Sequence, residues 1–506
     1  MTDFRDLVDL ASSRLGGAVM WANDEYFAEK ENMLKPGKPE WREHEYTDRG
    51  KWMDGWESRR KRVPGNDQAL VRLGVPGVIR GVVVDTAFFR GNHPSHCAIW
   101  ACDAPSDARV EDVLADEARW VQVLPKSELK GDTQNVFAVS CPWAFAWVHL
   151  DIFPDGGVAR FRVHGEVVPD WKRIGHARGE VDLAAIEHGG DALACSDTFF
   201  GERKNLIMPG RAKNPSDAWE TRRRRGPGHD WNILRLGATG TVRRVEIDTS
   251  HFKGNHPDTC TLEACHAPDA TLEALTGDGV AWRPLLEQTK LQAHTRHLFE
   301  AELAALGPVT HVRLCVFPDG GVSRLRVHCE LDRDARLALG LRRLDTLPPR
   351  SAEAVLRTCC GSARWVRGML DARPFGTASA LMEAAAAQWA ATAPEDWHEA
   401  FRSHPRIGES KAAAGQTTTE KRWSSQEQSG AAQADAEARA ALAEVNRAYE
   451  ARFGFIYIVC ATGRSAGELL DIARERLRNE PDDELRVAAG EQFKITRLRL
   501  EKLLEP

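Results

Sequence analysis

Apolar and polar residues follow two different patterns along this chain, and the pattern changes about two thirds of the way through it. In RFRVH, Phe161 and Val163 fall on one face of an extended chain, and the basic residues fall on the other. Leu325 and Val327 repeat the arrangement in RLRVH. A period of two predicts strands with one apolar face, and the reverse face of these strands is cationic.

The last third of the chain has a helical pattern. Between residues 431 and 453 the apolar positions recur every three or four residues, at Leu442, Val445, Tyr449 and Phe453. A second stripe of this kind runs from Leu485 to Leu504. Such spacing is typical of amphipathic helices, so we expect a β-rich region followed by an all-α domain.

The β-rich region is a tandem repeat. VVVDTAFFRGNHP at residues 82–94 returns as VEIDTSHFKGNHP at residues 245–257, and each copy contains one FPDGG turn followed by an Arg-x-Arg strand. Short strands between turn signals favour a β-sandwich for each copy. The domains that we predict are two homologous β-sandwich modules, 1–172 and 185–331, a charged linker, 332–346, and the all-α domain, 347–506.

Composition adds limits to this picture. A length of 506 residues fits about three domains, and 42% hydrophobic with 28% charged residues is ordinary for a globular protein. The net charge of −6 gives no reason to expect a nucleic-acid partner. The eleven cysteines contain no C-x-x-C, so we expect reduced thiols. MTDFRDLVDL lacks the features of an export signal, and we expect a cytoplasmic protein without a membrane partner.

Charged loops are the candidate chemistry of the repeat. GKWMDGWESRRKR and DAWETRRRR place tryptophan, carboxylate and arginine together in both copies. Guanidinium groups bind a carboxylate or ureido group in one orientation, and a nearby carboxylate can move a proton. The alternatives are an ion-paired surface for the arginines, turn formation for Asp155 and Asp319, and loop or metal-ligand roles for His93 and His256.

These strings, with FRGNHP, FKGNHP, GHDW and the doubled FPDGG-x-x-R-x-R, resemble allantoicase, which hydrolyses allantoate to (S)-ureidoglycolate and urea. The resemblance covers nearly all of residues 1–331. It implies two jelly-roll, galactose-binding-like modules, and it leaves open whether a divalent metal takes part. WMDG occurs only in the first copy and GHDW only in the second, so we expect the copies to differ in function. The candidate site residues that the resemblance implies are Asp54, Glu57, Arg59, Arg60, Asp85 and Asn92 in the first copy, and Glu220, Arg222, Arg223, Asp248 and Asn255 in the second.

Three strings carry the candidate chemistry of the helical domain: FRSHPRIGES, WSSQEQSG and FGFIYIVCATG. The proline after His404 disfavours helix at the histidine, so the imidazole is expected at a break between helices, where it can move a proton. The alternatives are a structural role for the histidine, a helix cap at Ser424 and a core segment for the apolar run FGFIYIVCATG.

Taken in order, and with RLRNEPDDE and ITRLRL, these strings resemble 2-oxo-4-hydroxy-4-carboxy-5-ureidoimidazoline (OHCU) decarboxylase, an all-α enzyme that yields (S)-allantoin without a cofactor. The resemblance implies His404 as the proton donor and Glu427 as its acidic partner. The substrate contacts that it implies are Pro405, Ser424, Ser425, Gln426, Glu427, Gln428, Tyr457, Ile458, Val459, Cys460, Ala461 and Arg499.

The sequence therefore predicts one chain with two enzymes of urate and allantoin breakdown, a hydrolase and a decarboxylase. The expected partners are the small-molecule substrates and further copies of the chain in a homo-oligomer. A separate enzyme must open allantoin to allantoate between the two steps, so direct transfer between the sites is not expected. The alternative is a non-catalytic sugar-binding or scaffold region attached to an active decarboxylase.

Overall fold

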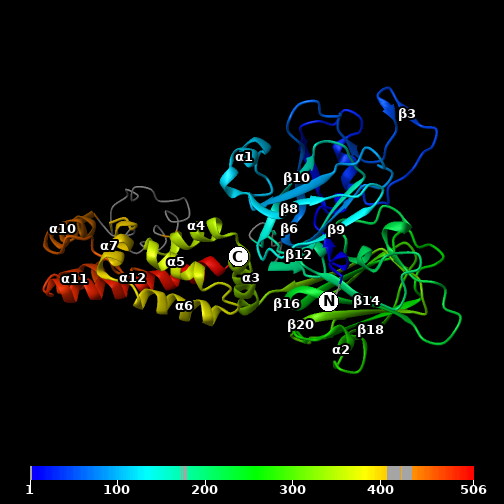
Figure 1. Cartoon of the computed structure of the whole chain (residues 1–506). Helices are drawn as coiled ribbons and strands as arrows, with labels where there is room; N and C mark the ends of the chain where they lie inside the picture. Colours follow the sequence, from blue (N-terminus) through cyan, green and yellow to red (C-terminus); the bar gives the residue numbers. More distant parts are fainter. Residues whose placement is uncertain (1–2, 172–173, 175–178, 407–422, 424–435, 506) are drawn as a thin grey trace. The chain divides into compact units, whose positions relative to one another are not determined.

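The computed structural model describes residues 3–505, except for residues 172–173, 175–178, 407–422 and 424–435. The chain forms two compact units, Met1–Ala335 and Arg336–Pro506, which are β-rich and helical respectively (Figure 1). This confirms the predicted order of two repeated β-rich modules and a helical region. None of the helices in the described part is long and apolar enough to cross a membrane.

The first module is built on an eight-stranded antiparallel sheet in the order β1-β12-β6-β10-β7-β8, with β2 and β9 also paired to β6. A separate ribbon joins β5 to β11, and another joins β3 to β4. The strands are β1 (Val8–Asp9), β2 (Ala18–Ala22), β3 (Tyr46–Thr47), β4 (Gly50–Lys51), β5 (Trp56–Glu57), β6 (Asp67–Asp85), β7 (His96–Cys102), β8 (Val121–Glu128), β9 (Gln134–Ala138), β10 (Ala144–Phe153), β11 (Gly157–Val158) and β12 (Arg160–Val167). The helical turns are η1 (Phe4–Asp6), η2 (Ser13–Leu15), η3 (Lys30–Leu34), α1 (Val110–Ala115) and η4 (Glu117–Arg119).

The second module repeats this topology, in the order β13-β22-β16-β20-β17-β18 with β14 and β19 paired to β16, and β15 paired to β21. Its strands are β13 (Glu180–Asp182), β14 (Asp191–Cys195), β15 (Trp219–Glu220), β16 (Asp230–Asp248), β17 (Thr259–Cys265), β18 (Arg283–Lys290), β19 (Arg296–Phe299), β20 (Pro308–Phe317), β21 (Gly321–Val322) and β22 (Arg324–Glu330). Its helical turns are η6 (Ile186–His188), η7 (Arg203–Ile207), η8 (Pro215–Asp217) and α2 (Leu272–Thr276). The repeat seen in the sequence is thus a repeat of the fold.

The Asp-Gly-Gly turns bring the repeated loops of each module together. Gly157 lies against the ring of Phe89, and a Cβ there would lie 2.0 Å from a ring atom. Gly321 lies against Phe252 in the same way, also at 2.0 Å. Only glycine permits this approach. The Gly157 N–H donates to the carbonyl of Asn92 at 2.8 Å, so the turn fixes the loop that carries a candidate site residue.

The helical unit packs its helices around one apolar core that includes Trp365, Phe401, Leu442, Tyr449 and Leu500. The helices are α3 (Arg333–Thr346), α4 (Pro349–Cys359), α5 (Ala363–Asp371), α6 (Ala378–Ala390), α7 (Pro394–Arg402), α10 (Ala436–Phe453), α11 (Ala466–Arg476) and α12 (Pro481–Leu504). Of the predicted stripe, Leu442 and Tyr449 are buried, and the other two members are partly buried against them.

Helix α3 occupies the span that was predicted as a linker. The charged residues and the following prolines suggested a connector between domains, but Leu341 and Leu344 are buried and belong to the helical core. A leucine-rich segment gains more by burying these side chains in a helix than by remaining solvated.

Candidate active sites

A buried carboxylate and a buried guanidinium lie at the centre of the first module. Arg160 Nη2 donates to Asp54 Oδ2 at 2.5 Å, and each side chain is only 4% exposed. The other N–H groups of Arg160 donate to the carbonyls of Gly37, Lys38, Asp54 and Ala159. Arg160 therefore has its donors in use and holds the surrounding loops in place.

Asp54 has a second cation and a backbone donor. Lys35 Nζ lies 2.9 Å from its Oδ1, and the Glu40 N–H donates to its Oδ2 at 3.0 Å. Burial alone would raise the pKa of this carboxyl, but the hydrogen bonds from Arg160 and Lys35 outweigh it and the pKa is lowered. Asp54 is thus held as a carboxylate.

Arg162, next to this ion pair, has an N–H donor group that is not used within the cluster. Its Nη2 donates to the carbonyl of Lys35, and its Nε lies 3.6 Å from Asp9. Within the described part of the chain, its buried Nη1 has no hydrogen-bond partner. A buried guanidinium N–H without an acceptor is costly, which marks the place where an acceptor belongs.

A cavity of about 130 Å³ opens beside Arg162. Asp85 lines it, opposite Arg160 in the register of β6 and β12, and Gln134 Nε2 donates to Asp85 Oδ2 at 3.2 Å. The lining residues are Pro36, Gly37, Lys38, Pro39, Val83, Asp85, Gln134, Arg160 and Arg162. The cavity thus combines a cation, a carboxylate and an amide, which are the groups that a small ureido acid can bond.

A carboxylate–amide pair recurs in both modules. Asn92 Nδ2 donates to Glu57 Oε1 at 2.7 Å, and Asn255 Nδ2 donates to Glu220 Oε1 at 2.5 Å. Burial raises the pKa of Glu57, and the Asn92 hydrogen bond opposes the shift only in part. A carboxyl of this kind can hold or release a proton nearer neutral pH than a solvated one.

The arginines after the Trp-Glu motif lie on the surface. Arg59 Nε donates to Asp24 at 2.6 Å and its guanidinium lies over the Tyr26 ring. Arg222 pairs in the same way with Asp197. Arg60 and Arg223 are exposed. At these four candidate positions the geometry favours the alternative of an ion-paired or solvated surface.

The turn aspartates hold the loop that follows the Trp-Glu motif in each module. Asp155 accepts from the Lys61 N–H, and Asp319 accepts from the Arg224 N–H, each at 2.7 Å. His93 Nδ1 contacts the carbonyl of Arg90 at 3.0 Å. Among the described residues, no three histidine, cysteine, aspartate or glutamate side chains are grouped as a metal site would require.

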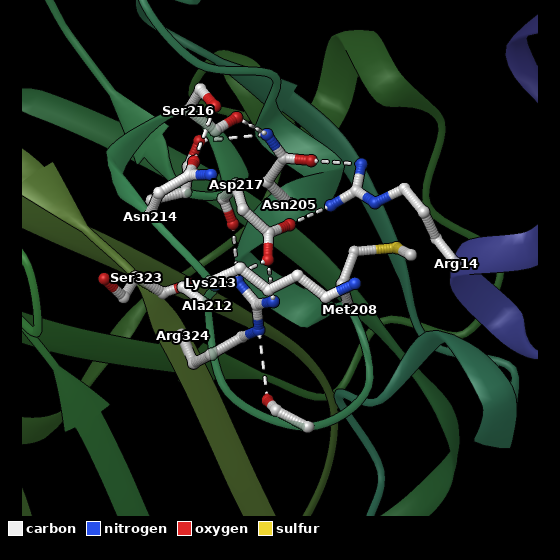
Figure 2. Close-up of polar contacts among 12 residues, drawn as sticks. Arg14, Asn205, Met208, Ala212, Lys213, Asn214, Ser216, Asp217, Ser323 and Arg324 are labelled. Carbon is white, nitrogen blue, oxygen red and sulfur yellow. Dashed lines mark hydrogen bonds and ion pairs between the residues drawn. The ribbon is translucent and has the colours of Figure 1, made fainter. Parts of the chain in front are cut away.

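The second module repeats the central cluster with Asp217 and Arg324 (Figure 2). Arg324 Nη2 donates to Asp217 Oδ2 at 3.1 Å, and its Nη1 donates to the Asp217 carbonyl at 2.6 Å. Asp248 lies opposite Arg324 in the register of β16 and β22, and its Oδ1 accepts from the Ser250 N–H at 2.8 Å. Arg326 takes the place of Arg162, and its buried Nη1 also lacks a partner among the described residues.

The residues beside the charged cluster differ between the two copies. In the first copy Gln134 lies opposite Asp85 in the strand register, and in the second copy Arg296 lies opposite Asp248. Glu246 of the second copy occupies the place that Val83 has in the first. Arg296 binds Glu246 with two hydrogen bonds, at 2.7 and 2.6 Å. The two copies therefore share a charged centre but present different side chains beside it.

In the helical unit, His404 follows α7 and faces α12. Burial and the nearby charge of Arg499 lower the pKa of His404 to about 3, and a contact with Gln492 opposes this. Arg499 is 2% exposed and its Nη1 donates to the Thr358 carbonyl at 3.3 Å. Gln492 is fully buried, and in the described part of the unit its Oε1 has no hydrogen-bond partner. The three side chains form one polar group, in which Gln492 and Arg499 are buried and His404 is partly buried.

The segment Tyr457–Ala461 is fixed by side chains from the flanking helices. Tyr457 Oη donates to the Leu469 carbonyl at 3.2 Å, Arg476 Nη1 donates to the Ile458 carbonyl at 2.8 Å, and the Cys460 N–H donates to Glu491 at 2.8 Å. Residues 424–428 lie outside the described residues. The partnership of His404 with Glu427, and the roles of Ser424, Ser425, Gln426 and Gln428, stay predictions.

Known proteins share both parts of this architecture. The family model of the allantoicase repeat matches residues 8–168 and 181–332. A probable allantoicase of Pseudomonas paraeruginosa is 48% identical over 324 residues, which cover 64% of this chain and 96% of that protein. The chain belongs to the allantoicase family. A probable allantoicase of Photobacterium profundum is 45% identical over 325 residues, and these cover 97% of it.

The solved structure of allantoicase from Saccharomyces cerevisiae matches the same part of the chain. It is 34% identical, covers 64% of this chain and 92% of its own, and has a TM-score of 0.53. Residues 345–501 match the family model of OHCU decarboxylase. The prediction of an allantoicase region followed by an OHCU decarboxylase region is thereby confirmed.

Several charged residues of the allantoicase region escaped the sequence analysis. Asp217 is the first residue of DAWETRRRR and stands where Asp54 stands in the first copy, so the alignment of the copies contained the signal. Arg160, Arg162, Arg324 and Arg326 were recognised as a cationic face but not as site residues. An alternating strand gives no indication that its polar face is buried by a loop from elsewhere in the chain.

Proposed function

We propose that the allantoicase region hydrolyses allantoate to (S)-ureidoglycolate and urea. The reaction takes place in the cavity beside Arg162 and at the corresponding position beside Arg326. We further propose that the helical unit decarboxylates OHCU to (S)-allantoin. One observation supports the first site above all others. At the same position of both modules, beside Asp85 or Asp248, a buried guanidinium has an N–H without a partner. A substrate carboxylate is the acceptor that such a group binds most strongly.

Allantoate carries one carboxylate and two ureido groups on a single carbon. We assign the carboxylate to Arg162, and the N–H and carbonyl groups of a ureido arm to Asp85 and Gln134. In the reaction the oxygen of water bonds to the central carbon, the bond from this carbon to one ureido nitrogen breaks, and a proton passes from water to the departing urea. Asp54 and Arg160 hold the loops of the site in place.

Glu57 is the group that we assign to proton transfer. Its pKa is raised by burial, and its Asn92 partner fixes one carboxyl oxygen. The same pair is present in the second copy as Glu220 and Asn255. A carboxyl whose pKa is raised keeps its proton to a higher pH than a solvated one, and is therefore suited to protonating a leaving group.

Urea release from allantoate tests the hydrolase. We expect Arg162→Met and Arg326→Met each to remove the contribution of one copy, and the double variant to release no urea. Arg243→Met is the matched control, because Arg243 is half exposed and pairs with Glu330 on the surface. Full urea release by the double variant, or none by the wild-type chain, would rule out this assignment.

For the decarboxylase, we assign His404 to proton delivery and Arg499 to recognition of the substrate anion. Loss of carbon dioxide breaks the bond between the ring carbon and the carboxylate, and the electron pair of this bond enters the conjugated ring. A proton from His404 then bonds to the same ring carbon. A bound anion offsets the charge of Arg499, which raises the pKa of His404 from its low value toward that of an imidazolium donor. With freshly generated OHCU, we expect the wild type to yield one enantiomer of allantoin and His404→Ala to yield only the racemic uncatalysed product. A single enantiomer from the variant would exclude this role.

We also propose that each module is a jelly roll and that the protein works in the cytoplasm as a homo-oligomer. None of the eleven cysteines, all of which lie in the described part of the chain, forms a disulfide, which suits a reducing compartment. The antiparallel pairing around the long strands β6 and β16 supports the jelly roll.

A further inference from the structure

The carboxylate of the second copy is bound by an arginine from the first module. Arg14 lies in helical turn η2 of the first module, and it extends to Asp217 and forms an ion pair with its Oδ1 (Figure 2). Its Nη1 also donates to Asn205 Oδ1 at 2.8 Å. Asp217 thus has two guanidinium partners, Arg324 on Oδ2 and Arg14 on Oδ1.

In the first copy the corresponding contact comes from within the module. Lys35 Nζ binds Asp54 Oδ1, while Arg160 binds Oδ2. The match extends to the backbone, because the Glu40 N–H donates to Asp54 Oδ2 and the Lys213 N–H donates to Asp217 Oδ2, both at 3.0 Å. The two networks therefore differ in the source of one cation.

Met208 explains why the second module needs an outside cation. It follows turn η7 as Lys35 follows turn η3, and each closes its turn by donating to an asparagine carbonyl. Their own carbonyls accept from the substrate-binding arginines, Lys35 from Arg162 and Met208 from Arg326. A thioether cannot bind a carboxylate as an ammonium does, so the charge on Asp217 is met by Arg14.

We propose that Arg14 is a positioning residue of the second allantoate site, so that this site is complete only when the first module supplies it. The proposal rests on the proposed hydrolase function. Arg14 fixes Asp217, and Asp217 with Arg324 fixes the loop 208–213. The Met208 carbonyl of this loop holds Arg326. Loss of Arg14 would therefore release the guanidinium that binds the substrate carboxylate.

The Arg162→Met chain is the background for the test, because its urea release reports the second copy alone. In it, we expect Arg14→Met to lower kcat/KM by about 10- to 100-fold, the range for a lost hydrogen bond to a charged group, and to do so mainly through a raised KM. The thermal unfolding midpoint is measured for every variant, and kinetics are recorded at a temperature where all remain folded.

Met208→Lys distinguishes a role of Arg14 in positioning Asp217 from a purely structural role in linking the two modules. Added to Arg14→Met, it returns a cation to the place that Lys35 occupies in the first copy, but it restores neither the Asn205 bond nor the link between modules. We expect kcat/KM to recover to within about threefold. The proposal is overturned if Arg14→Met changes kcat/KM less than twofold, or if Arg14→Lys restores a loss that Met208→Lys does not.

Two further results separate this proposal from the proposed function. If the wild-type chain releases urea but Arg162→Met releases none, the second copy is inactive and the Arg14 proposal fails while the hydrolase assignment stands. If the wild-type chain releases no urea, the hydrolase assignment itself fails.

Discussion

Removal of Arg476 should destabilise the helical unit more than the loss of any surface charge. Its Nε and Nη2 donate to Glu484 Oε1 at 2.8 and 2.5 Å, and Glu484 is fully buried. Tyr449 also donates to this carboxylate, and Asn479 donates to its other oxygen at 2.7 Å. In Arg476→Met the carboxylate would remain buried without its charge partner.

The cost can be estimated from the burial of this pair. Removing one partner of a buried ion pair costs about 3–5 kcal/mol, because the other charge is left uncompensated. For a domain of about 150–250 residues, each kcal/mol lowers the unfolding midpoint by about 2–4 °C, so we expect a fall of about 6–20 °C. Arg476 also donates to the carbonyl of Ile458, which is a candidate substrate contact. We therefore expect the rate of decarboxylation to fall together with the stability of the unit.

Circular dichroism at 222 nm follows the helical unit in the intact chain. Arg474→Met is the control on the same helix, since Arg474 is 59% exposed and should change stability by less than about 0.5 kcal/mol. Arg476→Met/Glu484→Leu removes both charges and should recover most of the loss. The reasoning is refuted if the single variant costs less than about 1 kcal/mol, or if the double variant is no more stable than the single one.

Three further predictions follow from single contacts. Gly157→Ala places a methyl group against a packed ring and should cost about 1–3 kcal/mol in urea unfolding, whereas Gly91→Ala, with open space around it, should cost far less. The pKa of Asp54 is lowered in the folded state, so the ionised carboxylate contributes to folding stability above the ordinary carboxyl pKa, and this contribution is lost as the pH falls. Asp54→Asn should therefore lower the unfolding midpoint at pH 7 but not at pH 2. An equal loss at both pH values would contradict this. Gln492→Glu puts a carboxylate beside His404 and should raise the pKa of this proton donor, which moves the alkaline limb of the decarboxylation pH profile to higher pH; an unchanged alkaline limb would exclude the contact.

The sequence predicted the order of elements well because the evidence for it is local. Alternation in β12 and β22 and the helical stripe of α10 depend on residues close together in the chain. The tandem repeat needed only comparison of the chain with itself. The linker prediction at residues 332–346 depended on charge and proline, and the helix found there depends on leucines that meet the distant core of the helical unit.

Some contacts among the candidate site residues were predictable from motifs, for a similar reason, but their roles stay predictions. Glu57 and Asn92, singled out from motifs, do lie together, and so do His404 and Arg499. The arginines of the Trp-Glu motif were favoured because they are abundant there, yet Arg59 binds a surface carboxylate. Arg14 could not be found from sequence, because nothing near it resembles a site, and its partner Asp217 is about 200 residues away.

The central claim is that one chain carries two independent enzymes, and a cross-comparison of activities tests it most directly. Urea release from allantoate and the enantiomeric excess of allantoin formed from OHCU would be measured on the full-length wild type, on His404→Ala and on Arg162→Met/Arg326→Met. We expect His404→Ala to lose only the decarboxylase and the double arginine variant to lose only the hydrolase. Loss of both activities in either folded variant, or of neither, would contradict the account.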